Sequence, residues 1–306
     1  MDKKEIINII NDIKIKLNKI SSQLVDVDDN SFVNDNFVEN SSFSENEFEI
    51  LKNLLYSEEW PEAVLDFQIV DENLEEEKMD RAEGIVDILI QEELEDKVIL
   101  DYGCGEGHIA KHISQQKSKK SIGYDISRTE KSKLLWEDES EGYLLTTNFE
   151  KVKENAPYDI IIIYDVLDHS EDPIEILNKA SSLLSDNGKI YLRCHPWCGR
   201  HGGHLYREIN KAFVHIIFSD EELKELGIID QEPNIKVIYP MAQYDRFIKS
   251  SNLKTIERDI DTQGVEDFFI KNEIITKRLK KIIDFKGFPT HQLSQCFHDY
   301  ILGKNS

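Results

Sequence analysis

Seven short apolar runs of strand length recur between residue 98 and residue 302. They lie at residues 98–100, 121–125, 143–150, 158–169, 189–193, 253–258 and 295–302, where the third and fourth ranges include the loop after the strand. The fourth run holds four consecutive isoleucines, Ile160 to Ile163, a pattern typical of a strand buried on both faces of a sheet. Apolar residues at helical spacing separate several runs, so the pattern predicts an α/β fold.

The first 25 residues carry a different pattern. Their apolar positions step by four and three residues in turn, which is the a/d seam of a coiled coil. These positions are Ile6, Ile10, Ile13, Leu17, Ile20 and Leu24. Such a helix either self-associates, binds another partner or docks on the rest of the chain. We favour self-association, because so short a helix is marginal alone.

The composition then divides the chain into three parts. Residues 26–47 are rich in Asp, Asn, Ser and Glu, which indicates an acidic linker that cannot build a core. Residues 48–95 show helical spacing with a break at Trp60-Pro61. We therefore expect a coiled-coil-like helix at 1–25, a linker at 26–47 and one folded domain at 48–306.

The first apolar run passes directly into a glycine turn. Val98–Leu100 is followed by Asp101 and by glycines at positions 103, 105 and 107, and a helical pattern starts at His108. Glycine permits sharp turns and close approach of a ligand, and a helix start offers free N–H groups. Together these features predict a nucleotide-type cofactor site at the carboxyl end of a parallel sheet.

Asp125 ends the second run, at a distance that suits one intervening helix. An acidic residue at this place accepts hydrogen bonds from ribose hydroxyls in dinucleotide-binding folds. The spacing Asp-x-Gly-x-Gly-x-Gly departs from the dinucleotide pattern, because the third glycine comes one residue early. It resembles instead the first motif of class I S-adenosylmethionine-dependent methyltransferases.

The resemblance covers residues 80–303 and includes a second motif. The stretch Asp165-Val166-Leu167-Asp168-His169 is similar to the family pattern of an acidic residue, Val-Leu, a second acidic residue and His after the central strand. The resemblance is to the small-molecule and general-purpose branch of the family. It implies a seven-stranded, mostly parallel, Rossmann-like sheet with an antiparallel terminal hairpin, and S-adenosyl-L-methionine as cofactor.

The resemblance also implies cofactor-binding residues. The residues that would cradle the amino-acid part of the cofactor are Asp101, Gly103, Gly105 and Gly107. Asp125 would bind the ribose, and Asp165 would line the pocket beneath the methyl group. Asn148 stands where the family often has an Asp near the adenine, and its amide carbonyl can accept the same hydrogen bond.

In this fold the helical segment before the first strand commonly covers the cofactor pocket. Residues 48–95 occupy that place in the chain. Tyr56, Trp60 and Arg81 are therefore candidate lid residues, although packing and surface roles are the simpler interpretation for each of them alone.

An unusual His/Cys-rich insertion, residues 194–218, follows the fifth run. His195, Cys198, His201 and His204 are spaced His-x2-Cys-x2-His-x2-His, and such a set can hold zinc, but the spacing matches no standard finger or ribbon. We favour an acceptor-binding loop. The candidate general bases are His169, His195 and His201, and the candidate acceptor-binding residues are Arg200, His204 and Arg207.

Charge and composition narrow the class of partner. The chain has 60 acidic and 37 basic residues and a formal net charge of −23, which disfavours nucleic acid and anionic membranes. The four cysteines show no secreted-type framework, and no stretch is apolar enough for a bilayer span or a signal peptide. We expect a cytoplasmic protein with reduced thiols and a small-molecule acceptor.

These observations lead to one preferred function and two alternatives. We expect methyl transfer to an oxygen of a small polar or anionic acceptor, such as a sugar or metabolite. The alternatives are a non-catalytic scaffold that retains the fold, and an RNA or protein methyltransferase. The Asp/Asn-Pro-Pro-Tyr/Phe and Pro-Cys signatures of DNA-base methyltransferases are missing from the sequence.

Overall fold

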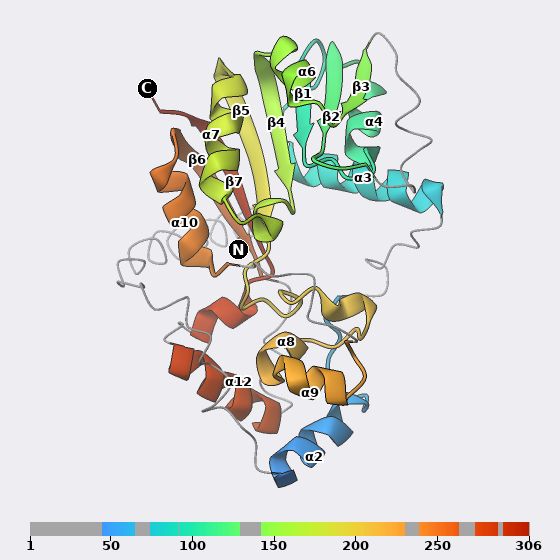
Figure 1. Ribbon diagram of the computed structural model, residues 1–306, viewed down its shortest axis with the longest axis vertical. Coiled ribbons are helices and arrows are strands. Elements are labelled where there is room, and N and C mark those ends of the chain that lie inside the picture. Colours follow the sequence, from blue (N-terminus) through green and yellow to red (C-terminus); the bar gives the residue numbers. More distant parts are fainter. Residues whose placement is uncertain are drawn as a thin grey trace, which may run out of the picture. The chain divides into compact units, whose positions relative to one another are not determined.

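One mixed sheet of seven strands organises the domain (Figure 1). The computed structural model describes residues 45–64, 74–90, 92–128, 142–229, 239–262, 273–286 and 290–305. The predicted coiled-coil-like helix and all but the last residues of the predicted linker lie outside these ranges. The strands are β1 (Val98–Tyr102), β2 (Lys120–Tyr124), β3 (Tyr143–Thr146), β4 (Tyr158–Tyr164), β5 (Leu184–Cys194), β6 (Leu253–Asp261) and β7 (Phe297–Lys304).

The sheet has the order β3-β2-β1-β4-β5-β7-β6. The first five of these strands pair in parallel, whereas β7 runs antiparallel to both β5 and β6. This arrangement confirms the predicted seven-stranded, mostly parallel sheet with an antiparallel terminal hairpin. The carboxyl ends of β1, β2 and β4 meet at one edge, as the predicted cofactor site requires.

Two layers of helices cover the sheet. The helices around it are α3 (Glu75–Leu89), α4 (His108–Ser114), α6 (Phe149–Glu154), α7 (Pro173–Leu183) and α10 (Met241–Ser250). Ile160 and Ile162 of β4 pack in a core cluster with residues of α3 and α4. Ile161 and Ile163 pack in another cluster with residues of α7 and α10. Alternate residues of β4 thus face opposite layers, which explains the run of isoleucines.

Local sequence signals set the starts of several helices. Asp172 caps α7 by accepting a hydrogen bond from the Glu175 N–H, and Pro173 occupies the first turn. The turn residues Asp186-Asn187-Gly188 predict that this helix ends there, with Gly188 in a left-handed conformation. That prediction is wrong, because α7 ends at Leu183, and the described glycines with positive φ do not include Gly188, which lies within β5.

The remaining α-helices of the described residues form a second group. It comprises α2 (Glu45–Leu55), α8 (Val214–Ile217), α9 (Asp220–Glu225) and α12 (Glu273–Lys286), and short 3-10 turns lie at Leu167–His169, Leu205–Arg207 and Thr290–Ser294. The rings of Phe48 and Trp60 contact Phe218 at centroid distances of 6.2 and 6.0 Å. Ser219 and Glu222 form a complete capping box at the start of α9. Among the described residues, no helix is both long and apolar enough to cross a membrane.

Candidate active site

The glycine turn after β1 adopts a backbone that other residues disfavour. Gly103, Gly105 and Gly107 all have positive φ angles, of 82°, 53° and 94°. A Cβ atom on Gly103 would lie 2.3 Å from a Val166 methyl group, and one on Gly107 would lie 2.4 Å from Leu145. The turn is therefore packed closely against β3 and against the residues after β4. At Gly105, by contrast, a Cβ atom would meet open space.

Asp101 lies at the base of this turn, and its side chain is buried. Its Oδ2 atom has no hydrogen-bond partner. Burial raises the pKa of Asp101 to about 7, although a backbone hydrogen bond at Ala110 opposes the rise. A buried acceptor without a donor is costly to maintain, so this oxygen is suited to a donor on a ligand.

Asp125 and Asn148 follow β2 and β3 and differ in how free their side chains are. Asp125 accepts hydrogen bonds from the Gly105 and Ser127 N–H groups, at 2.8 and 3.2 Å. Asn148 caps α6, and its carbonyl oxygen accepts a bond from the Glu150 N–H at 3.0 Å. Asp125 is thus tied directly to the glycine turn, whereas the Asn148 carbonyl already serves a structural purpose.

A cavity of about 240 Å³ lies above the turn. Its walls come from α3, from the turn with the start of α4, and from the end of β4. The lining residues are Lys78, Arg81, Ala82, Ile85, Asp101, Gly103, Cys104, Gly105, Glu106, His108, Ile109 and Tyr164. Sequence reasoning pointed to Arg81 but missed Lys78 and Tyr164, for which only their positions before β1 and at the end of β4 gave a signal.

The other two candidate lid residues lie elsewhere. Trp60 is 1% exposed, stacks on Phe218 and donates its indole N–H to the Ala212 carbonyl. Tyr56 is exposed, and its hydroxyl contacts the Leu226 carbonyl at 3.4 Å. Neither residue lines the cavity, so Trp60 is a packing residue and Tyr56 is a surface residue. Of the three candidate lid residues, only Arg81 lines the cavity.

The residues after β4 and β5 meet beside this cavity. Tyr164 lines the cavity, and Asp165 follows it with a left-handed φ of 52°. The Asp165 Oδ1 atom lies 3.0 Å from His195 Nδ1. A hydrogen bond from the Tyr244 hydroxyl to the His195 carbonyl, 2.9 Å long, fixes the backbone after β5. Strain at Asp165 costs roughly 1–3 kcal/mol and persists only where the surroundings impose it.

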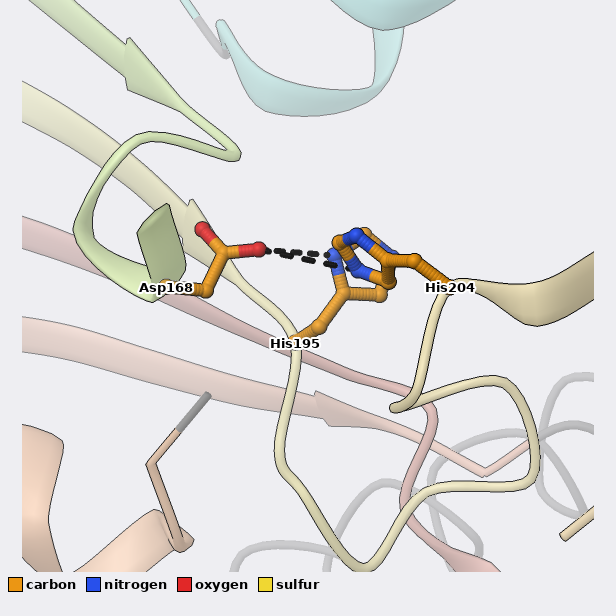
Figure 2. Close-up of side chains that lie close together, drawn as sticks. All are labelled: Asp168, His195 and His204. Carbon is orange, nitrogen blue, oxygen red and sulfur yellow. Dashed lines mark ion pairs between the residues drawn. The ribbon is translucent and has the colours of Figure 1, made fainter. Parts of the chain in front are cut away.

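Asp168 forms the centre of a cluster of imidazole rings. Its Oδ2 atom lies 3.5 Å from His195 Nδ1, 3.7 Å from His204 Nε2 and 3.6 Å from His169 Nε2. Figure 2 shows Asp168, His195 and His204 pointing toward one another. The structure thus brings three of the predicted histidines together around the carboxylate of Asp168, which belongs to the motif after β4 but is not among the predicted site residues.

The other predicted site residues of the insertion make no ion pair with Asp168 among the described contacts, and they differ in burial and in the groups that they contact. His201 is buried, its ring centroid lies 4.9 Å from that of His195, and neither ring nitrogen has a hydrogen-bond partner. Cys198 is also buried, but its Sγ atom contacts Gln292 Oε1 at 3.6 Å. Arg207 is exposed and lies over the ring of Tyr206, and the Arg200 carbonyl accepts a bond from Phe213.

Charge is distributed unevenly over the imidazole rings. Burial disfavours a proton on His195, but the carboxylates of Asp165 and Asp168 outweigh it and raise the pKa of His195 to about 9. Burial, with His195 nearby, lowers the pKa of His204 to about 3. The same causes hold the pKa of His201 well below its usual value.

Comparison with known proteins assigns the family. The profile of the family described as "Methyltransferase domain" matches residues 73–227, which is just over half of the chain. The chain belongs to this methyltransferase family. With the sheet order and the glycine motif, it is a class I S-adenosylmethionine-dependent methyltransferase, as the sequence predicted.

Individual relatives are more distant. A ubiquinone biosynthesis O-methyltransferase of Vibrio vulnificus (strain YJ016) is 25% identical over 194 residues, which are 61% of this chain and 74% of the relative. The crystal structure of a putative S-adenosylmethionine-dependent methyltransferase from Listeria monocytogenes has a TM-score of 0.46 and 11% identity over 74% of this chain and 98% of that one. The crystal structure of the plantazolicin methyltransferase BamL, in complex with a triazolic desmethylPZN analog and S-adenosylhomocysteine (SAH), has a TM-score of 0.44 and 19% identity. The match covers 74% of this chain and 86% of that one.

The glycine turn fits the cofactor of this family. The unpartnered oxygen of Asp101 and the open space at Gly105 both belong to the cavity wall. Asp101 would hold the amino-acid part of S-adenosylmethionine against the glycine turn, and Asp125 would hold its ribose. When bound there, the cofactor supplies an electrophilic methyl group.

Proposed function

We propose that the enzyme transfers the methyl group to an oxygen of a small polar acceptor that binds at the Asp168 cluster. The supporting observation is the position of Asp165. It follows Tyr164, which lines the cofactor cavity, and it contacts His195 of the cluster. Cofactor and acceptor would therefore meet across this one segment. The name of the Vibrio vulnificus relative, an O-methyltransferase, supports oxygen as the target atom.

The residues of the cluster would position the acceptor and accept its proton. A hydroxyl group must lose its proton as the new carbon–oxygen bond forms and the carbon–sulfur bond breaks. The cluster offers buried carboxylate oxygens and ring nitrogens without hydrogen-bond partners, which suit both tasks. Arg81 interacts electrostatically with Tyr164 and Asp165, so it is the nearby cation for an acceptor that carries an anionic group.

A transfer assay with labelled S-adenosylmethionine tests this function. Phenols, hydroxy acids and sugars form the acceptor panel, and primary amines of similar size form the comparison. The expected result is label in a base-stable ether or a base-labile ester, and none in the amines. Transfer to amines alone would contradict the oxygen assignment.

A pair of variants separates chemistry from folding. His195→Gln should lower kcat by on the order of 100-fold while the affinity for S-adenosylhomocysteine changes little, because His195 lies outside the cofactor cavity. His112→Gln is the matched control, since His112 is buried in α4 and contacts Gln116 rather than the cluster. A chain that binds the cofactor but transfers methyl to no acceptor would favour the scaffold alternative.

A further inference from the structure

The carboxylate of Asp168 is buried without a hydrogen-bond donor. Its side chain is 0% exposed, and neither of its oxygens has a hydrogen-bond partner. His204 Nε2, which faces it, has none either, and His195 Nδ1 lies 3.0 Å from Asp165 Oδ1 but without the geometry of a hydrogen bond. Buried polar groups in proteins are normally satisfied, so three such atoms aimed at one another call for a common partner (Figure 2).

The separations suit a metal ion better than direct hydrogen bonds. His195 Nδ1 and His204 Nε2 lie 3.5 and 3.7 Å from Asp168 Oδ2, and the three ligand atoms all lie within 4.8 Å of one another. Ligands bound tetrahedrally to one zinc ion at 2.0–2.1 Å are separated by about 3.4 Å. These contacts are longer than hydrogen bonds and close to the ligand spacing of a bound ion.

The charge of the surroundings also favours a cation. Asp165 lies 3.0 Å from His195 Nδ1, so two carboxylates adjoin the same ring. In the described part of the chain, the ion pairs of Asp165 and Asp168 come from histidine rings and from neither lysine nor arginine. A divalent ion would displace the proton of His195, because a ligating imidazole is neutral, and would neutralise both carboxylates in its place.

The loop that carries His204 is held in place. His204 adopts a left-handed φ of 53°. A Cβ atom on Gly202 would lie 2.5 Å from the Pro196 carbonyl oxygen, and one on Gly203 would lie 2.2 Å from the Cβ atom of His215. Strained backbone of this kind is imposed by surrounding packing and is common at functional sites.

We propose that Asp168, His195 and His204 bind a divalent transition-metal ion of the zinc class. Two imidazole nitrogens and one carboxylate oxygen form a donor set that zinc and its neighbours prefer over magnesium. Three protein ligands leave a further position open, as in catalytic zinc sites. Metal binding itself does not depend on the proposed acceptor. The role of the ion in catalysis rests on the proposed function: the ion would hold the acceptor oxygen in that open position and ease the loss of its proton.

Metal content and affinity test the proposal directly. The full chain is stripped with a chelator, titrated with Zn²⁺ against a chromophoric competitor, and analysed for bound metal. One Zn²⁺ per chain is expected, with Mg²⁺ unable to displace it. Asp168→Asn and His204→Gln should each weaken Zn²⁺ binding more than about tenfold, since even outer-shell changes cost 10–100-fold. No stoichiometric Zn²⁺, or a site that selects Mg²⁺, would overturn the proposal.

Cys198→Ser is the matched control. Cys198 lies in the same loop, but its sulfur contacts Gln292, so zinc affinity should stay unchanged. Loss of zinc in Cys198→Ser would overturn the Asp168 site in favour of a Cys/His site. Co²⁺ loading gives an independent readout, because nitrogen and oxygen ligands produce no thiolate charge-transfer band.

Binding of S-adenosylhomocysteine, measured on every variant, verifies the fold and keeps the two proposals distinct. A protein that binds the cofactor product but no zinc overturns the metal site alone. A protein that binds zinc at these residues but transfers no methyl group overturns the proposed function alone.

Discussion

The Oδ1 atom of Asp165 lies 3.0 Å from His195 Nδ1, and this contact joins the ends of two neighbouring parallel strands. Asp165 follows β4 and His195 follows β5. Tyr164, one residue earlier, lines the cofactor cavity. The segment Tyr164–Asp165 therefore connects the cofactor cavity to the Asp168 cluster.

Asp125→Ala should weaken the binding of S-adenosylhomocysteine. The carboxylate anchors the Gly105 N–H and is the proposed ribose acceptor. A hydrogen bond to a charged group contributes about 1.5–3 kcal/mol, so affinity should fall about 10- to 100-fold. Calorimetric titration measures the loss. Asp186→Ala, at a side chain that is 98% exposed, is the control and should bind as the wild type does.

Asp101→Asn should make the enzyme more stable at high pH but poorer at binding cofactor. The pKa of Asp101 is raised to about 7 in the folded chain from a usual value of 3.8. Its contribution to stability is therefore full below about pH 4 and is lost as pH rises through 7. Denaturant titration of the ligand-free variant should show a gain on the order of 4 kcal/mol at pH 8 as an upper bound, and little at pH 4. An equal gain at both pH values would contradict this account.

Gly103→Ala and Gly105→Ala should fail in different ways. Both positions have positive φ, which costs alanine about 1–2 kcal/mol. Gly103→Ala also forces its methyl group to 2.3 Å from Val166, so overpacking should remove a further 1–3 kcal/mol or so. Gly105→Ala has open space and should lose only the first amount, but its methyl group should reduce cofactor affinity. Chemical denaturation and calorimetry together separate the two effects.

Trp60→Phe should reduce the stability of the fold, whereas Arg81→Gln should reduce the affinity for the cofactor. Trp60 is buried against Phe218 and donates to the Ala212 carbonyl, so its replacement should destabilise the fold by about 1–3 kcal/mol without changing cofactor affinity. Arg81 lines the cavity, so Arg81→Gln should weaken cofactor binding severalfold with little loss of stability. A cofactor defect in Trp60→Phe would restore it as a lid residue.

The sheet and the glycine turn were predictable because their signals are local. A strand that ends in Asp101 and a close series of glycines specifies its own turn, and four isoleucines in β4 match a strand with two covered faces. The end of α7 was misjudged because β5 begins at Leu184, where pairing with Tyr158 prevails over the turn propensity of Gly188.

The Asp168 cluster was predictable only in part. Adjacent parallel strands bring the residues after β4 and β5 together, so His195 near Asp165 follows from the fold. The fold does not determine which other histidine of the insertion joins the cluster, because glycines at 199, 202 and 203 allow the loop many paths. Tertiary packing decided it by directing Cys198 to Gln292 and His204 to Asp168.

The position of β7 has a consequence for the synthesis of this protein. Among the described strands, β6 pairs only with β7, and β7 also completes the edge of β5. A nascent chain therefore contains β6 before it contains the strand that attaches β6 to the sheet. Until residues 297–304 leave the ribosome, the edges of β5 and β6 stay open to other chains, and chaperone protection matters most in that interval.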